Sequence, residues 1–150
     1  MVLRLRHAAM LALITSVWCW LLTALHGVWS FGIVLGYLDG GRVPLYPNWS
    51  VTYWGFFMDA IGAFAVPFLL ILTVCSVLPK YTHLPVLLTA WMLGAFIGAS
   101  NTVFIYQIDF GATWAPLEAL RALYVHPIVT PFCILFGLAG TVSLTRPQRG

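Results

Sequence analysis

A single carboxylate, Asp59, stands inside a long apolar stretch that runs from about residue 51 to residue 78. A charged side chain is costly inside a membrane, so it usually has a partner or a function there. Two interpretations stay open. In the first, Asp59 links two helices by pairing with Arg121 or by accepting a hydrogen bond from Asn101. In the second, Asp59 contacts a ligand or transfers protons. Pro67, eight positions on, predicts a kink in the same stretch.

Two histidines, His26 and His126, stand in other apolar stretches. Such a pair could ligate a haem, or could bind a metal ion together with Asp59. An intramembrane histidine is more often hydrogen-bonded to a neighbouring helix. The sequence therefore predicts no cofactor and no metal site.

The composition places these groups in a membrane protein. Of the 150 residues, 61% are hydrophobic and 7% are charged, and the mean hydropathy is +0.95. A soluble domain of this length would carry several times more charge on its surface. No polar stretch is long enough for a separate soluble domain. We expect one membrane domain over residues 1–150 and no nucleic-acid partner.

Four apolar stretches are long enough for the roughly 20 residues of a membrane-crossing helix. They cover about residues 9–36, 52–78, 84–106 and 117–143. Loops rich in Gly and Pro separate the first two and the last two of them. The sequence thus predicts an all-α fold, a four-helix bundle in the plasma or inner membrane or in the endoplasmic reticulum.

Basic residues near the ends of the spans predict the orientation of this bundle. Those on one side are Arg4, Arg6, Lys80, Arg146 and Arg149. Arg42 lies on the other side. Because cytoplasmic loops carry an excess of Lys and Arg, both termini should be cytoplasmic.

This orientation puts the intramembrane polar groups at a common depth. At about 1.5 Å per residue, the outer half of the bilayer holds His26, Asp59, Asn101, Arg121 and His126. One polar pocket, open toward the outer face, would satisfy them together. Pro127 and Pro131 interrupt the backbone next to His126, which is typical of a helix that lines a cavity.

Gly94 and Gly98 form a GxxxG motif in the third span. Small residues at this spacing let two helices approach closely, either within the bundle or between two copies of the chain. We therefore expect, beside a hydrophobic small molecule or lipid, a possible homodimer or larger membrane complex that uses this motif.

The chain also resembles the EXPERA superfamily, which includes the emopamil-binding sterol isomerases and the sigma-2 receptor. The segments that carry the resemblance are residues 39–47 (DGGRVPLYP), Met58-Asp59 ahead of Pro67-Phe68, Ser100-Asn101, and residues 124–132 (YVHPIVTPF). The resemblance implies a cavity for a sterol-like or other hydrophobic ligand. It also implies that Asp39 matches the acidic residue that follows the first span in the family.

Isomerase chemistry is the further implication of this resemblance. In such enzymes an acid donates a proton to a ring double bond and a second group removes one elsewhere. The resemblance gives these catalytic roles to Asp59 and His26. Asn101 and Tyr124 would orient the ligand. Aromatic faces would stabilise the carbocation, and the matching side chains are Trp29 and Trp54.

The candidate ligand-binding residues are then Asp39, Trp54, Asn101, Arg121, Tyr124 and His126. The leading hypothesis is a pocket for a hydrophobic small molecule, sterol-, lipid- or terpenoid-like, with isomerase-type turnover left open. One alternative is a non-catalytic membrane subunit or assembly factor, for which the GxxxG motif suffices. A proton-coupled transporter and a haem- or metal-binding protein are the remaining alternatives.

Overall fold

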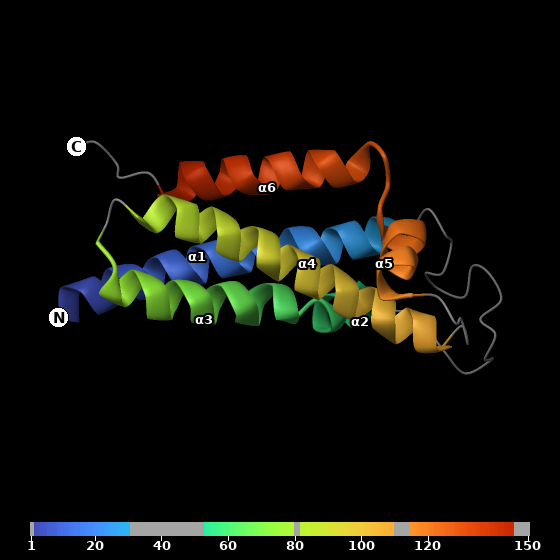
Figure 1. The fold of residues 1–150 in the computed structure, drawn as a ribbon, viewed down its shortest axis with the longest axis horizontal. Coiled ribbons are helices and arrows are strands. Elements are labelled where there is room, and N and C mark those ends of the chain that lie inside the picture. Colours follow the sequence, from blue (N-terminus) through green and yellow to red (C-terminus); the bar gives the residue numbers. More distant parts are fainter. Residues whose placement is uncertain (1, 31–52, 80–81, 110–114, 146–150) are drawn as a thin grey trace.

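The computed structural model describes residues 2–30, 53–79, 82–109 and 115–145, and all regular structure in these ranges is helical (Figure 1). The elements are α1 (Val2–Gly27), α2 (Tyr53–Asp59), α3 (Gly62–Val77), α4 (His83–Asp109), α5 (Pro116–Ala119), the π-helical turn η3 (Leu120–Tyr124) and α6 (Val129–Thr145). A wider helical turn extends α1 through Ser30. The all-α prediction is confirmed.

Three helical stretches are long and apolar enough to cross a membrane: Arg4–Ser30, Trp54–Val77 and His83–Ile105. A fourth apolar helix, Val129–Ser143, is shorter. By helix length and hydropathy this is a multi-pass membrane protein. The start of α1 and the end of α6 lie at the same end of the bundle (Figure 1). Residues 31–36 of the predicted first span lie outside the described residues.

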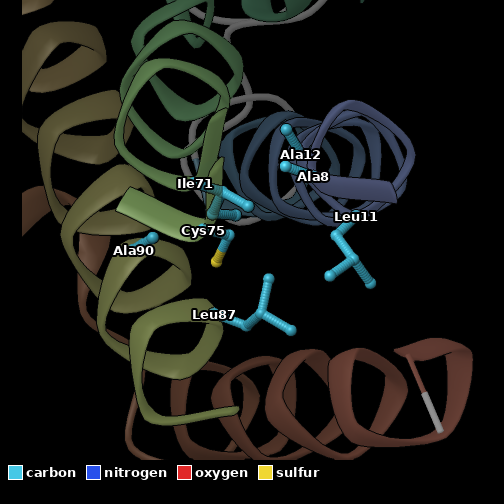
Figure 2. Close-up of a cluster of buried hydrophobic side chains, with 7 residues drawn as sticks. All are labelled: Ala8, Leu11, Ala12, Ile71, Cys75, Leu87 and Ala90. Carbon is cyan, nitrogen blue, oxygen red and sulfur yellow. The ribbon is translucent and has the colours of Figure 1, made fainter. Parts of the chain in front are cut away.

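Apolar side chains fill the end of the bundle where α1 begins (Figure 2). This cluster consists of Ala8, Leu11 and Ala12 from α1, Ile71 and Cys75 from α3, and Leu87 and Ala90 from α4. All seven are at most 4% exposed. The described candidates His26, Asp59, Asn101 and Arg121 lie toward the opposite end, where the helices are interrupted.

The second span consists of two helices. α2 ends at Asp59 and α3 begins at Gly62. Between them, the N–H groups of Ile61 and Ala63 donate to carbonyls only three residues earlier in the chain. An uninterrupted helix would direct these two N–H groups to the carbonyls of Phe57 and Asp59. The break therefore frees both carbonyls.

Side chains from α1 and α4 donate to the two freed carbonyls. The indole Nε1 of Trp20 donates to the carbonyl of Phe57 at 2.7 Å. Asn101 Nδ2 donates to the carbonyl of Asp59 at 2.6 Å. An unsatisfied backbone carbonyl is costly in hydrocarbon, so these contacts stabilise the break. Asn101 thus does bond to residue 59, but the acceptor is the main-chain oxygen.

The second span is not interrupted at Pro67, where the sequence predicts a kink. The break lies at Ala60–Ile61, and Pro67 is buried inside α3. Proline has no N–H to donate to Ala63, and Gly94 of α4 approaches the pyrrolidine ring there. A Cβ on Gly94 would lie 2.4 Å from Pro67 Cγ and 3.3 Å from the carbonyl oxygen of Ala63.

The GxxxG motif packs within the chain. Gly94 and Gly98 are both buried, and a Cβ on Gly98 would lie 2.7 Å from Ala63 Cβ. Of the two uses that the sequence left open, the structure shows close packing of α4 on α3. Neither glycine is left at the surface for contact with a second copy.

Replacing Asn101 by Leu should destabilise the α2–α3 break. The substitution removes the N–H donor to the Asp59 carbonyl, and an unsatisfied polar group of this kind costs about 1–3 kcal/mol. Equilibrium unfolding in mixed detergent micelles would measure the loss. Trp20→Phe should shift stability in the same direction. Thr73→Val is the matched control, because the Thr73 hydroxyl bonds to carbonyls of its own helix. Wild-type stability of both Asn101→Leu and Trp20→Phe would contradict the capping role.

Gly94→Ala should destabilise the monomer without changing its oligomeric state. The new Cβ collides with the Pro67 ring, and overpacking of this kind costs about 1–3 kcal/mol. Gly62→Ala is the control, because its Cβ would meet the Cγ2 of Ile97 at 3.2 Å and that side chain can adjust. Thermal unfolding and light scattering in detergent would report the two quantities. Dissociation of an oligomer at unchanged monomer stability would contradict the intrachain packing.

Candidate functional site

A cavity of about 210 Å³ lies between α1, α4, η3 and the start of α6. Its wall is mainly apolar and includes Leu22 of α1, Trp91 and Phe96 of α4, and Ile134 of α6. The polar residues in the wall are Thr23, His26, Tyr124 and Thr130. α2 and α3 contribute no residue to it.

The interruption between η3 and α6 shapes one side of this cavity. The N–H of Val125 donates to the carbonyl of Leu120, five residues earlier, at 3.2 Å, and Val125 itself is extended. Pro127 has no N–H and disfavours helical conformation in His126 before it. Pro131 lies in the first turn of α6, where no N–H is needed. The stretch predicted as the fourth span is therefore two helical pieces with a break beside His126.

His126 and Thr130 bond to the backbone N–H groups at the start of α6. His126 Nδ1 accepts from the N–H groups of Ile128 and Val129 at 3.3 and 3.2 Å. Thr130 Oγ1 accepts from the N–H of His126 at 2.9 Å, and the N–H of Thr130 donates to the His126 carbonyl. Helix N-termini leave N–H groups without intrahelical partners. His126 therefore acts as a helix cap.

The His26 cluster, formed by His26, Ser30, Tyr124 and Thr130, joins three elements beside the cavity. His26 Nε2 lies 2.7 Å from Thr130 Oγ1, and His26 Nδ1 lies 3.1 Å from Ser30 Oγ. Ser30 Oγ donates to the Tyr124 carbonyl at 3.2 Å. The rings of His26 and Tyr124 stack at 4.3 Å, and the Tyr124 hydroxyl donates to the carbonyl of Thr23 at 2.7 Å.

The directions of these bonds assign the protons. Ser30 has one hydroxyl proton, which goes to a carbonyl, so Ser30 Oγ accepts from His26 Nδ1–H. His26 Nε2 then accepts the Thr130 hydroxyl proton. Both ring nitrogens of His26 are occupied in this arrangement, and ligation of a haem would break one of the bonds. Within the described ranges, no three His, Cys, Asp or Glu side chains lie together as a metal site would require.

Two of the predicted site residues meet at the cavity. His26 and Tyr124 both line it and stack on each other. His126 is linked to this pair through Thr130 but does not line the cavity.

The remaining predicted residues lie elsewhere. Asp59 and Asn101 meet at the α2–α3 break, outside the cavity wall. Trp54 is 65% exposed and stacks on Phe57, and Arg121 is exposed on η3. Asp39 lies outside the described residues. The structure thus separates the polar groups that the sequence assigned to one pocket.

Sequence reasoning missed Ser30 and Thr130. Ser30 follows His26 by four residues, a spacing that places two side chains on one helix face. Thr130 follows the Pro127 interruption, where Ser and Thr often cap the next helix. These two local signals could have identified both hydroxyls, although not the contact of Ser30 with η3 or that of Thr130 with α1.

No protein-family model, curated protein or solved structure matches this chain. The resemblance to the EXPERA superfamily thus stays a proposal. The site has to be judged by its own geometry.

Thr130→Val should disrupt the His26 cluster while keeping the side-chain shape. It removes the hydroxyl that bonds to His26 and to the N–H of His126, at a cost of about 1–3 kcal/mol in unfolding free energy. The ¹⁵N NMR shifts of His26 should change because Nε2 loses its donor, and Thr130→Ser should restore them. Thr102→Val is the control, because Thr102 is buried but bonds to the Gly98 carbonyl of its own helix. Unchanged His26 shifts in Thr130→Val would contradict the proton assignment.

Proposed function

We propose that this membrane protein binds a hydrophobic small molecule in the cavity between α1, α4, η3 and α6. The observation that supports this function is the cavity itself, with its mainly apolar wall and the ordered His26 cluster at its side. Ligand sites are typically apolar cavities with a few convergent polar groups.

The volume limits the size of the ligand. At about 210 Å³, the cavity exceeds the roughly 150 Å³ of an apolar cavity that admits benzene. It is smaller than the roughly 300–1,000 Å³ of pockets for drug-sized ligands. A single ring or one chain segment fits this space. A whole sterol would require the helices to move apart.

Membership of the EXPERA superfamily and isomerase activity belong to the same proposal. His26 and Tyr124 line the cavity, and in this proposal they take the acid–base and orienting roles that the resemblance implies. An acid–base pair formed by Asp59 and His26 would need both groups at one ligand, and Asp59 is not in the wall. We therefore propose binding of the ligand as the function, in preference to its catalytic conversion.

The four-helix arrangement and its orientation are also part of the proposal. The start of α1 and the end of α6 share one end of the bundle (Figure 1), and Arg4 and Arg6 lie at this end. The excess of basic residues there favours the cytoplasmic side. The cavity then lies toward the outer side of a plasma, inner or endoplasmic-reticulum membrane.

Native mass spectrometry with lipid extraction tests the binding function. A hydrophobic molecule should co-purify with the wild-type chain and be lost from Ala95→Phe, because Ala95 lines the cavity and the larger side chain fills it. Asp59→Asn should retain the molecule, because Asp59 lies outside the wall. Circular dichroism would confirm that both variants fold.

Two other results would change the conclusion. If Asp59→Asn also lost the molecule, Asp59 would have to be part of the binding site, and the acid–base mechanism would be favoured. A wild-type chain that carries no small molecule, but is held in a larger membrane complex, would contradict the binding function and favour the non-catalytic subunit.

A further inference from the structure

The mouth of the cavity lies on the outer surface of the helix bundle. Met92 and Phe96 of α4 and Val125 after η3 line the cavity, yet they are 41%, 49% and 47% exposed. Side chains that belong both to a cavity wall and to the molecular surface mark the place where the two meet. The mouth therefore lies along the seam between α4 and the η3–α6 segment.

This seam lies at the depth of the hydrocarbon core. The third span runs from His83 to Ile105, and Met92 follows His83 by nine residues. At about 1.5 Å per residue, Met92 lies roughly 14 Å into a hydrocarbon layer that is about 30 Å thick. Acyl chains, rather than water or lipid head groups, surround this depth of the protein.

The polar groups of the wall offer no hydrogen bond to an occupant. Thr130 Oγ1 and both ring nitrogens of His26 bond within the His26 cluster, and the Tyr124 hydroxyl donates to the Thr23 carbonyl. The Thr23 hydroxyl bonds to the sulfur of Cys19, one turn earlier in α1. A polar group of an occupant would have to break one of these bonds or lose its own partner, and both are costly in a low-dielectric site.

Trp91 Nε1 is the exception, because it has no partner among the described residues. This nitrogen cannot bond to an occupant of the cavity, because it is fully buried. Gly137 of α6 lies against that edge of the indole, and a Cβ there would lie 2.6 Å from Trp91 Cε2. The accessible part of the wall is therefore apolar.

Because the mouth opens on the bundle surface at the depth of the hydrocarbon core and the accessible wall is apolar, we infer that the occupant is the acyl chain of a bilayer lipid. The chain enters sideways through the seam, and its head group stays outside the bundle. This inference rests on the proposed function and names its ligand class. The small volume fits a flexible chain segment, and the acyl chain is the molecule that the mouth meets in the membrane.

Photolabelling of the full chain in phosphatidylcholine vesicles tests this inference. A fraction of the lipid carries a diazirine near the middle of one acyl chain, and mass spectrometry locates the adducts. Leu22 should be labelled, because it lines the cavity but is only 9% exposed. Leu135, at 67% exposed, reports ordinary contact with lipid, and the fully buried Ile71 reports background.

Ala95→Phe should reduce the labelling of Leu22 to the level of Ile71 and leave Leu135 unchanged. Labelling of Leu22 by a photoreactive sterol, but not by the acyl probe, would overturn the acyl-chain assignment and keep the binding function. No labelling of Leu22 by either probe, while native mass spectrometry still finds a bound molecule, would overturn lateral access. Absence of both signals would contradict the proposed function itself.

Discussion

Backbone N–H and C=O groups in hydrocarbon need partners within the protein, because lipid supplies none. This constraint acts most strongly where a membrane helix is interrupted, as happens at two places in the part of the chain that the structure describes. At the α2–α3 break, Trp20 and Asn101 donate to the two freed carbonyls. At the break before α6, the Ser30 hydroxyl donates to the Tyr124 carbonyl, and His126 accepts from the first N–H groups of α6.

These contacts also position the candidate site. α1 takes part at both breaks, through Trp20 at one and Ser30 at the other, so it fixes α2, η3 and α6 relative to one another. The stacking of His26 on Tyr124 holds η3 against α1 beside the cavity. Because the polar groups satisfy the backbone and each other, the space they enclose is left apolar. The same constraint that stabilises the breaks therefore favours a hydrocarbon occupant over a polar substrate.

The sequence by itself determined the class of the fold. Composition and the lengths of the apolar stretches predicted an all-helical membrane protein, because a membrane crossing requires a long apolar helix whatever its neighbours are. Pro127 predicted an interruption beside His126, because a missing N–H and a restricted preceding residue act locally. The sequence named His26 and Tyr124 as candidates on different helices, and the structure stacks their rings beside the cavity.

Only the tertiary structure decided which groups meet. The break at Ala60–Ile61 has no proline, and its stability comes from Trp20 and Asn101 on other helices. Whether Gly94 would contact α3 or a second copy depended on which helix lay opposite. Asp59 shares an expected depth with His26, but depth gives no direction around the helix axis, and the packing of α2 on α1 and α4 left Asp59 outside the cavity wall. Pairwise contacts between distant segments carry no local signal, so a single sequence could not specify them.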